Sequence, residues 1–307
     1  MGRYIARRLL QAIPVFLGTT FLIFALVFAI PGDPIRALSG DKPVSPAVYA
    51  EMQDRYNLND PFLVQYGKYM AGLVQGDFGR DFRGREVRDI MSERFPVTVK
   101  LALIALGFEI LIGITAGVLA GLRRGSFMDN LVLISTTLVV SIPVFVLGFT
   151  AQIMLGVKLG WFPIAGLSQG WKSYLLPGMV LAALSLAYVA RLTRTSLVEN
   201  LRSDYIRTAV AKGLPRRRVV GRHALRNSLI PVVTYLGIDL GSLMAGAIVT
   251  EGIFNIPGVG QQVFLSIRQQ EGPVVIGIVT VLVLVFIFAN LIVDVLYGVL
   301  DPRIRYE

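Results

Sequence analysis

LLQAIPVFLGTTFLIFALVFAI runs from Leu9 to Ile30 without a charged residue in 22 positions. Because about 20 apolar residues cross the hydrocarbon core of a bilayer as a helix, this stretch predicts a membrane span. It is longer than the apolar part of a secretory signal peptide, and the sequence AIPGDP that begins at Ala29 has proline where a cleavage site needs a small residue. We therefore expect a retained span, which Arg3, Arg7 and Arg8 precede.

The rest of the chain has the same apolar character. Hydrophobic residues make up 54% of it, charged residues 16%, and the mean hydropathy is +0.64. Such values are typical of an integral membrane protein. Five further runs are candidate spans: Leu101–Leu122, Leu131–Val157, Tyr174–Ala190, Ser228–Thr250 and Val274–Leu300. The expected fold is an all-α integral membrane protein with six transmembrane helices.

The charges of the connections predict the orientation. Seventeen lysines and arginines lie before the first run and after the second, fourth and sixth, ten of them between Arg191 and Arg226. The short connections on the other side hold three, Lys158, Lys172 and Arg268. Because cytoplasmic loops are enriched in basic residues, we expect both termini in the cytoplasm. The net charge of +10 then reflects topology, and the basic loop lacks the interleaved aromatic residues of a nucleic-acid site.

Three parts follow from these runs. Residues 1–30 are expected to form a cytoplasmic segment and the first span, residues 31–97 an extracytoplasmic loop, and residues 98–307 a five-helix core that includes segment 199–228. In the loop, Ser45-Pro46 and Asp60-Pro61 are signals for helix starts. We therefore expect a small, folded helical cap outside the membrane.

Several kinds of chemistry are excluded. With no cysteine and one histidine, the chain has no thiolate or histidine-rich metal centre, and we expect no metal site. It has no G-x-x-x-x-G-K-[ST] phosphate loop, so it is not itself an ATPase. The lone histidine lies in a cytoplasmic loop, away from any serine in the membrane. An aspartic protease pair of Asp239 and Asp294 has no supporting motif. We expect a protein that is not an enzyme.

The basic segment RTAVAKGLPRRRVVGRHALRNSLIP, from Arg207 to Pro231, has a pattern that orientation alone does not require. Ile206, Val210 and Leu214 recur every four residues and predict a short amphipathic helix. Gly213 and the proline two residues later are typical of one helix ending and another beginning. Small residues here would let the surface of another protein approach the backbone. The three consecutive arginines are equally consistent with contacts to lipid head groups.

This segment resembles the cytoplasmic loop of permease subunits of ATP-binding-cassette importers, in which a glycine follows an E-A-A-like stretch and a hydrophobic-proline pair stands further on. Here RTAVAKG ends at Gly213 and LIP ends at Pro231, while Arg207, Thr208 and Ala209 replace the strict E-A-A start. That departure is usual in the dipeptide and oligopeptide branch of the family. Further stretches that resemble this branch are IPGDP (30–34), LNDPFLVQYGKYM (58–70), GDFG (76–79), SIPVFVLG (141–148), GWFPIAG (160–166), EGIFNIPGVGQ (251–261) and YGVLDPRIR (297–305).

The resemblance, which is strongest to the first of the two permeases in such systems, implies an importer in the bacterial plasma (inner) membrane. This chain would form half of the pathway in a heterodimer with a second permease subunit. Two ATP-binding subunits, using ATP and Mg, would drive it, and an extracytoplasmic peptide-binding protein would deliver di- or oligopeptides. No cofactor is implied for this chain. The helix ending at Gly213 would be the coupling helix, and its implied docking residues are Ala209, Ala211, Lys212, Gly213, His223 and Arg226.

Three acids lie within the apolar runs: Glu109, Asp239 and Asp294. A charge at mid-membrane costs at least about 2.5 kcal/mol, so such acids normally face protein or water. Each is a candidate for the translocation pathway or for the interface with the second permease. Structural hydrogen bonding is the alternative for all three.

The segment EGIFNIPGVGQQVF, which begins at Glu251, is a candidate outer gate. The Pro257-Gly258 pair predicts a turn, and Phe254 supplies an apolar anchor. Irregular backbone at membrane depth is tolerated only where protein or a water-filled cavity covers it. A gate near the mouth of the pathway and a plain surface turn are both consistent with this pattern.

Two other transport functions stay open. A permease of the same family could carry nickel or another small solute. An ion-coupled secondary transporter would use the intramembrane acids and need no ATPase, but such folds often contain inverted repeats, and the sequence shows no internal repeat.

Overall fold

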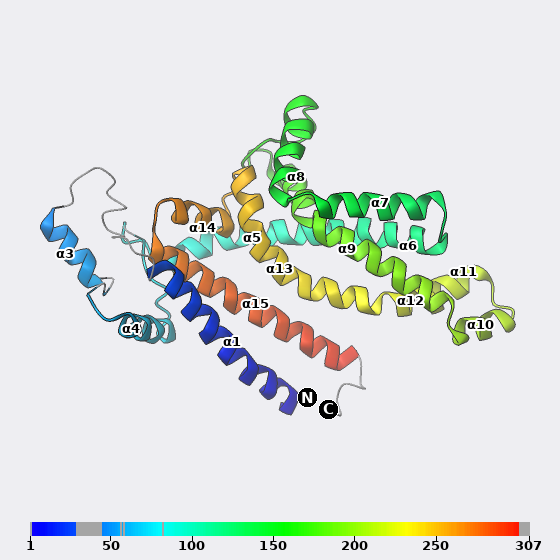
Figure 1. Ribbon diagram of the computed structural model, residues 1–307, viewed down its shortest axis with the longest axis horizontal. Coiled ribbons are helices and arrows are strands. Elements are labelled where there is room, and N and C mark those ends of the chain that lie inside the picture. Colours follow the sequence, from blue (N-terminus) through cyan, green and yellow to red (C-terminus); the bar gives the residue numbers. More distant parts are fainter. Residues whose placement is uncertain (1, 29–44, 56, 58, 82, 301–307) are drawn as a thin grey trace. The chain divides into compact units, whose positions relative to one another are not determined.

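The computed structural model describes residues 2–28, 45–55, 57, 59–81 and 83–300. Among them there are helices and no strand, apart from a single bridge between Arg80 and Glu86 (Figure 1). The IPGDP motif and the two C-terminal arginines of the charge pattern lie outside the described residues.

The first part of the chain forms α1 (Gly2–Phe28), α3 (Pro46–Arg55), α4 (Phe62–Val74), α5 (Val87–Phe108), the π-helix η1 (Glu109–Ile114), α6 (Thr115–Leu122), α7 (Phe127–Ser141), α8 (Val144–Ala151) and the π-helix η2 (Gln152–Lys158). The second part forms the 3-10 helix η3 (Gly170–Tyr174), α9 (Leu175–Leu201), α10 (Asp204–Ala211), α11 (Arg216–Arg218), the π-helix η4 (Val219–Ala224), α12 (Leu225–Ser228), α13 (Ile230–Phe254), α14 (Val259–Arg268) and α15 (Gly272–Leu300).

Four of the described helical stretches are long and apolar enough to cross a membrane: Ala6–Val27, Val87–Leu122, Gly170–Leu201 and Gly272–Leu291. Two bent helix pairs, Phe127–Lys158 and Arg216–Ala245, raise the number to six if each pair is one span. The all-α integral membrane class is therefore confirmed, with four to six candidate spans. The number six and the orientation of the termini remain predictions.

The chain divides into two compact units, Met1–Thr98 with Pro257–Glu307, and Val99–Ile256. The three parts expected from the sequence are consecutive segments of the chain. The first compact unit instead combines an N-terminal and a C-terminal segment. The three-part division of the sequence is not tested by these units and remains a prediction.

The third apolar run is not one straight helix. It breaks between α7 and α8, whose axes differ by 103°. The break lies at Ile142, which has extended backbone angles of −102° and 126°, directly before Pro143. Proline disfavours helical backbone at the residue before it and has no N–H to donate, so the helix ends there and a new one begins. Figure 1 shows α8 turning sharply away from α7.

In the first unit, aromatic rings join α4 to α1. Phe21 and Phe24 of α1 pack against Phe62 and Tyr66 of α4 at centroid distances of 5.2–5.7 Å. The Tyr69 hydroxyl is 2.7 Å from the hydroxyl of Thr280 on α15, and burial raises the pKa of Tyr69 to about 12. The phenol therefore stays protonated at physiological pH, and α4 is held against both long helices of this unit.

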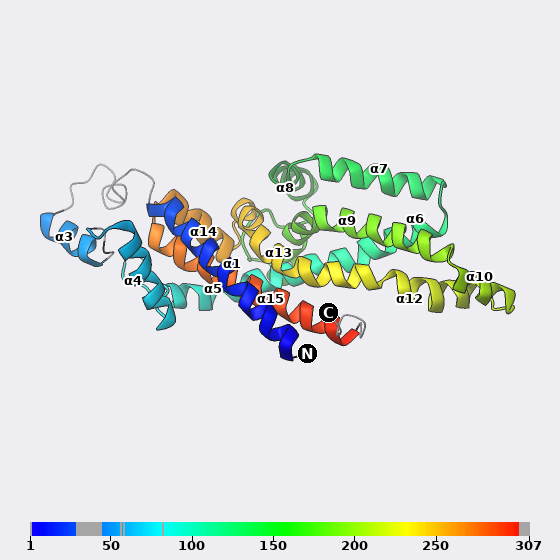
Figure 2. The same cartoon turned by 60° about the horizontal axis from the view of Figure 1, so that its bottom comes forward.

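In the second unit, a row of glycines lets α6 approach α9 closely. Gly113, Gly117 and Gly121 stand four residues apart, and a Cβ at Gly117 would lie 2.5 Å from the carbonyl oxygen of Ala190 and the Cβ of Thr193. Small residues at this spacing let membrane helices pack backbone to backbone. Figures 1 and 2 both show α6, α7 and α9 side by side. The sequence contains this pattern, GITAGVLAG, but our sequence analysis did not use it.

An ion pair joins the start of α7 to α9. The guanidinium of Arg194 donates from Nε and Nη2 to the two carboxylate oxygens of Asp129 at 2.5 and 2.8 Å. Asp129 also accepts a hydrogen bond from the backbone N–H of Gly125, and its side chain is 2% exposed. Such a bidentate pair fixes the geometry of the turn between α6 and α7.

Asp129→Asn is expected to lower the melting temperature of the purified protein by about 5 °C or more, because it leaves a partly buried guanidinium without its charged partner. The measurement is thermal unfolding in detergent. The control is Asp204→Asn, because the Asp204–Arg207 pair is exposed and such pairs contribute little. Equal shifts for the two variants would contradict the importance of the buried pair.

Candidate functional site

The coupling segment was predicted as residues 199–228; because α9 extends to Leu201, it is defined here as residues 203–228, which follow the end of α9 directly. Ile206 and Ala209 of α10 are buried against Leu197 of α9 and against Val219 and Ala224 of η4. The segment therefore has its own small apolar core and is attached to α9 through it. Figure 2 shows α10 and α12 at the same end of α9.

Gly213 follows the end of α10 and has a backbone conformation that favours glycine. Its φ is +76°, in the left-handed region. Its N–H donates to the carbonyl of Val210, and the N–H of Leu214 donates to the carbonyl of Ala209. This pair of hydrogen bonds is the Schellman motif, which satisfies the last carbonyls of a helix. Leu214 packs on the core beside Ala209, so the end of α10 is fixed.

The six predicted docking residues do not share one environment. Ala211, Lys212, Gly213 and Arg226 are exposed, and His223 is half-buried. Ala209 is 7% exposed and packs inward. The structure thus brings the first three together on one exposed turn, with Ala209 supporting that turn from inside. Val210, which the sequence analysis assigned to the apolar stripe, is 60% exposed on the same helix.

The acid cluster consists of Glu109, Asp239 and Tyr235. Glu109 is the first residue of η1 and is fully buried, and Asp239, on α13, is 6% exposed. The Tyr235 hydroxyl donates to Asp239 Oδ1 at 3.3 Å. Glu109 and Asp239 are electrostatic neighbours, and Tyr235 lies beside both. The structure therefore brings together two acids that lie 130 positions apart in the sequence.

The acid cluster has unused hydrogen-bonding capacity. Among the residues that the structure describes, no other side chain or backbone N–H donates to either carboxylate oxygen of Glu109 or to Asp239 Oδ2, and the two acids are close enough to hydrogen-bond to each other through a shared proton. Buried polar groups normally have partners, so unpartnered atoms at a buried site require an explanation. A π-helix such as η1, which begins at Glu109, often occurs at functional sites.

Helix α9 adds an aromatic side to the acid cluster. The rings of Tyr188 and Tyr235 lie 4.4 Å apart between centroids, at 36° to each other. Tyr188 is 52% exposed, and Ser185 lies beside the Tyr235 hydroxyl. Tyr235 was not among the residues predicted from the sequence. The pattern that could have identified it is a tyrosine one helical turn before an intramembrane acid. The third predicted acid, Asp294, is on α15, and its side chain lies outside the described residues.

The candidate outer gate is the end of α13 and the start of α14. The turn is made by Asn255, with φ of 49°, whereas Gly258 is extended and begins α14. Phe254 is fully buried, Pro257 is exposed and Gly258 is buried. The left-handed residue is therefore Asn255, and the predicted Pro257-Gly258 pair instead supplies the start of the next helix. Whether this segment gates a pathway stays a prediction.

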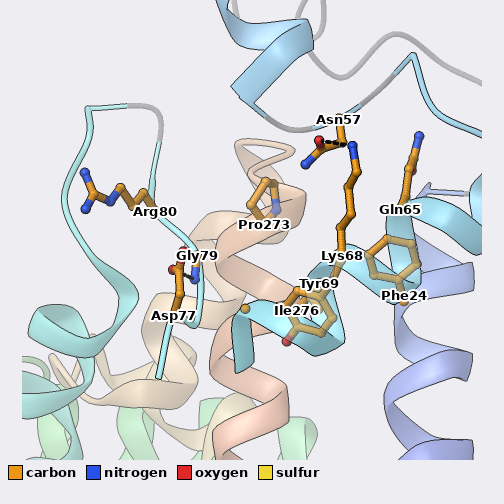
Figure 3. Close-up of a pocket in the computed structure, with 11 residues that line it drawn as sticks. Phe24, Asn57, Gln65, Lys68, Tyr69, Asp77, Gly79, Arg80, Pro273 and Ile276 are labelled. Atoms are coloured by element: carbon orange, nitrogen blue, oxygen red, sulfur yellow. Dashed lines mark hydrogen bonds between the residues drawn. The ribbon is translucent and has the colours of Figure 1, made fainter. Parts of the chain in front are cut away.

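The first unit contains a cavity of about 370 Å³. Phe24, Tyr69 and Ile276 contribute apolar side chains to it, and Lys68 donates from Nζ to Asn57 at 2.9 Å (Figure 3). The same ammonium forms an ion pair with Asp60 at 2.5 Å. The cationic side chain is thus already paired within this unit.

Within the described part of the chain, no group of three or more metal-ligating side chains is placed to hold a metal ion. The candidate sites are therefore the coupling segment, the acid cluster and the turn before α14.

Comparison with known proteins finds family matches over most of the chain. Residues 113–306 match the model of the binding-protein-dependent transport system inner membrane component, and residues 1–102 match the N-terminal model of the same kind of membrane component.

Full-length similarity extends to several curated permeases. The chain is 40% identical to the di/tripeptide transport system permease protein DppB of Pseudomonas aeruginosa. It is 38% and 37% identical to the dipeptide transport system permease proteins DppB of Alkalihalophilus pseudofirmus and Escherichia coli K12. Each comparison covers 100% of both chains. The chain therefore belongs to the family of inner membrane components of binding-protein-dependent transport systems.

Proposed function

We propose that this chain is one of two permease subunits of an ATP-driven importer of di- and oligopeptides in the bacterial inner membrane. It spans the membrane six times with both termini in the cytoplasm. An extracytoplasmic binding protein delivers the peptide, and two ATP-binding subunits hydrolyse ATP with Mg. The full-length similarity to permeases named for dipeptides and di/tripeptides supports the substrate class.

The observation that carries the coupling mechanism is the attachment of the coupling segment to α9. Leu197 of α9 is fully buried in the same core as Ile206 and Ala209. A force applied to α10 is therefore transmitted to a helix long enough to cross the membrane. In this proposal α10 sits in a groove of an ATP-binding subunit, and rigid-body motion of that subunit tilts α9.

The exposed turn at Ala211, Lys212 and Gly213 is the docking surface, and Arg226 and His223 make supporting contacts. Phe254 and the Pro257-Gly258 pair that begins α14 contribute to an outer gate. Arg216–Arg218 are exposed and contact lipid head groups in addition to orienting the chain.

Uptake by the reconstituted complex tests the function. Proteoliposomes that contain this chain, its partner permease, the ATP-binding subunits and the binding protein are expected to accumulate a labelled dipeptide when ATP and Mg are supplied inside. A proton gradient without ATP should give no accumulation. Uptake that follows the gradient alone would favour a secondary transporter, and uptake of Ni²⁺ in place of dipeptide would assign the metal as substrate.

A further inference from the structure

We infer that the acid cluster and Tyr188 together form a binding site for an ammonium group, and that the group they bind is the amino terminus of the transported peptide. The inference rests on the proposed function, because it takes the peptide as substrate. It adds the part of the peptide that is recognised within the membrane and the residues that recognise it.

The two acids of the cluster have no cationic partner within the described part of the chain. Glu109 and Asp239 both lie in helices that are candidates to cross the membrane. Among the described residues, no lysine or arginine forms an ion pair with either acid. On α9, Arg191 and Arg194 are hydrogen-bonded to Thr136 and Asp129. Two neighbouring acids in a buried site are stabilised by a proton that they share or by a cationic partner, and the described part of this chain supplies no such cation.

The acid cluster also has unused hydrogen-bonding capacity. Three carboxylate oxygens of the pair, both of Glu109 and Oδ2 of Asp239, are buried and receive no donor from the rest of the described chain, so the only hydrogen bond open to them is the one between the two acids. An ammonium group has three N–H donors and no acceptor. An ammonium group that replaces the proton shared by the two acids can donate to these oxygens.

The route from the surface to the acid pair leads past the two tyrosines. Burial increases in order from Tyr188, which is 52% exposed, through half-buried Tyr235 to Asp239 at 6% and Glu109 at 0%. The two tyrosine rings are in contact, and the Tyr235 hydroxyl is bonded to Asp239. Aromatic faces attract cations, so the rings form the outer part of a site whose inner part is the acid pair.

Binding to the intact complex in nanodiscs, without the binding protein and without ATP, tests this inference. The labelled probes are alanylalanine methyl ester, which keeps the amine, and N-acetyl-alanylalanine methyl ester, which differs from it only in lacking the amine. The wild type is expected to bind the ester at least about 30-fold more tightly, the scale for removing one partner of a buried charge pair. Asp239→Asn and Glu109→Gln should each remove most of that preference.

Two further variants separate recognition from folding. Tyr188 is 52% exposed in this chain, so Tyr188→Leu is expected to leave the chain folded while removing the aromatic face, and Tyr188→Phe keeps that face. Leucine should weaken binding of the ester by several-fold, and phenylalanine should preserve it. The matched control is Glu251→Gln, which removes a buried acid at the far end of the same helix α13 and should keep the preference for the ester.

Equal binding of the two probes by the wild type would overturn the inference. So would an unchanged preference in both acid variants, or equal loss of preference in Glu251→Gln. Dipeptide uptake by the reconstituted wild type is measured separately. Its absence would overturn the proposed function and this inference with it, whereas normal uptake with equal binding of the probes would overturn the inference alone.

Discussion

Gly213→Val is expected to reduce ATP-dependent peptide uptake by roughly 5- to 150-fold, the range that a lost coupling free energy of 1–3 kcal/mol produces. Two effects combine. Valine in left-handed backbone is strained by about 1–2 kcal/mol, which disturbs the end of α10. Its side chain also projects from the exposed turn proposed to meet the ATP-binding subunit. Hydrolysis of ATP by the complex should continue, because this chain takes no part in that chemistry.

The structure provides a matched pair of controls for this result. A Cβ at Gly213 would meet no atom of the described chain within 4 Å, so any effect of bulk there comes from the backbone or from a partner. Gly213→Asn separates these, because asparagine tolerates left-handed backbone. Gly213→Asn should still impair uptake if the exposed turn contacts the ATP-binding subunit, because the added side chain projects from that turn.

Gly125→Val is the second control. Gly125 has φ of +79°, is exposed and also has open space around a Cβ, but it lies in the turn between α6 and α7. Uptake and ATPase activity are measured in the same proteoliposomes. Full uptake by Gly213→Val, or an equal loss in Gly125→Val, would contradict the assignment of the coupling segment.

Gly117→Leu is expected to cost about 3 kcal/mol or more of folding free energy, at the upper end of what overpacking costs. The reason is that even a Cβ there would lie 2.5 Å from the carbonyl oxygen of Ala190. Backbone atoms on both helices would have to separate. The variant should fail to accumulate in membranes as folded protein, whatever the substrate or partner.

Gly107→Leu is the matched control for this second prediction. It lies on the same candidate span, Val87–Leu122, and a Cβ there meets nothing within 4 Å. The amount of monodisperse protein after solubilisation and its melting temperature measure the difference. If Gly117→Leu were as abundant and as stable as Gly107→Leu, α6 and α9 would not pack as the structure has them.

The helices could be predicted because their signals are local. The apolar runs, the proline-based starts of α3 and α4, and the glycine that ends α10 all depend on a few adjacent residues. Breaks within the apolar runs were harder to predict from the sequence. Proline at position 143 was visible, but the 103° bend depends on how the chain continues after it.

The acid cluster shows why the site could be predicted only in part. Glu109 and Asp239 could each be identified from the sequence as an intramembrane acid, because burying a charge in the membrane is costly. That they are neighbours depends on how η1 and α13 pack, which no spacing within one helix encodes. Ala209 is a similar case: the same small side chain suits an exposed docking surface or a tight core, and only the packing on Leu197 distinguishes them.

Helix α9 is continuous over 27 residues, from Leu175 to Leu201, and its one proline, Pro177, lies in the first turn. At a rise of about 1.5 Å per residue it is about 40 Å long. A rotation of about 5° about its C-terminal end would displace its N-terminal end by roughly 3.5 Å, about the van der Waals diameter of a carbon atom. Such amplification requires that the helix not bend, so α9 from any two states of the transport cycle should superimpose on itself while its neighbours change orientation around it.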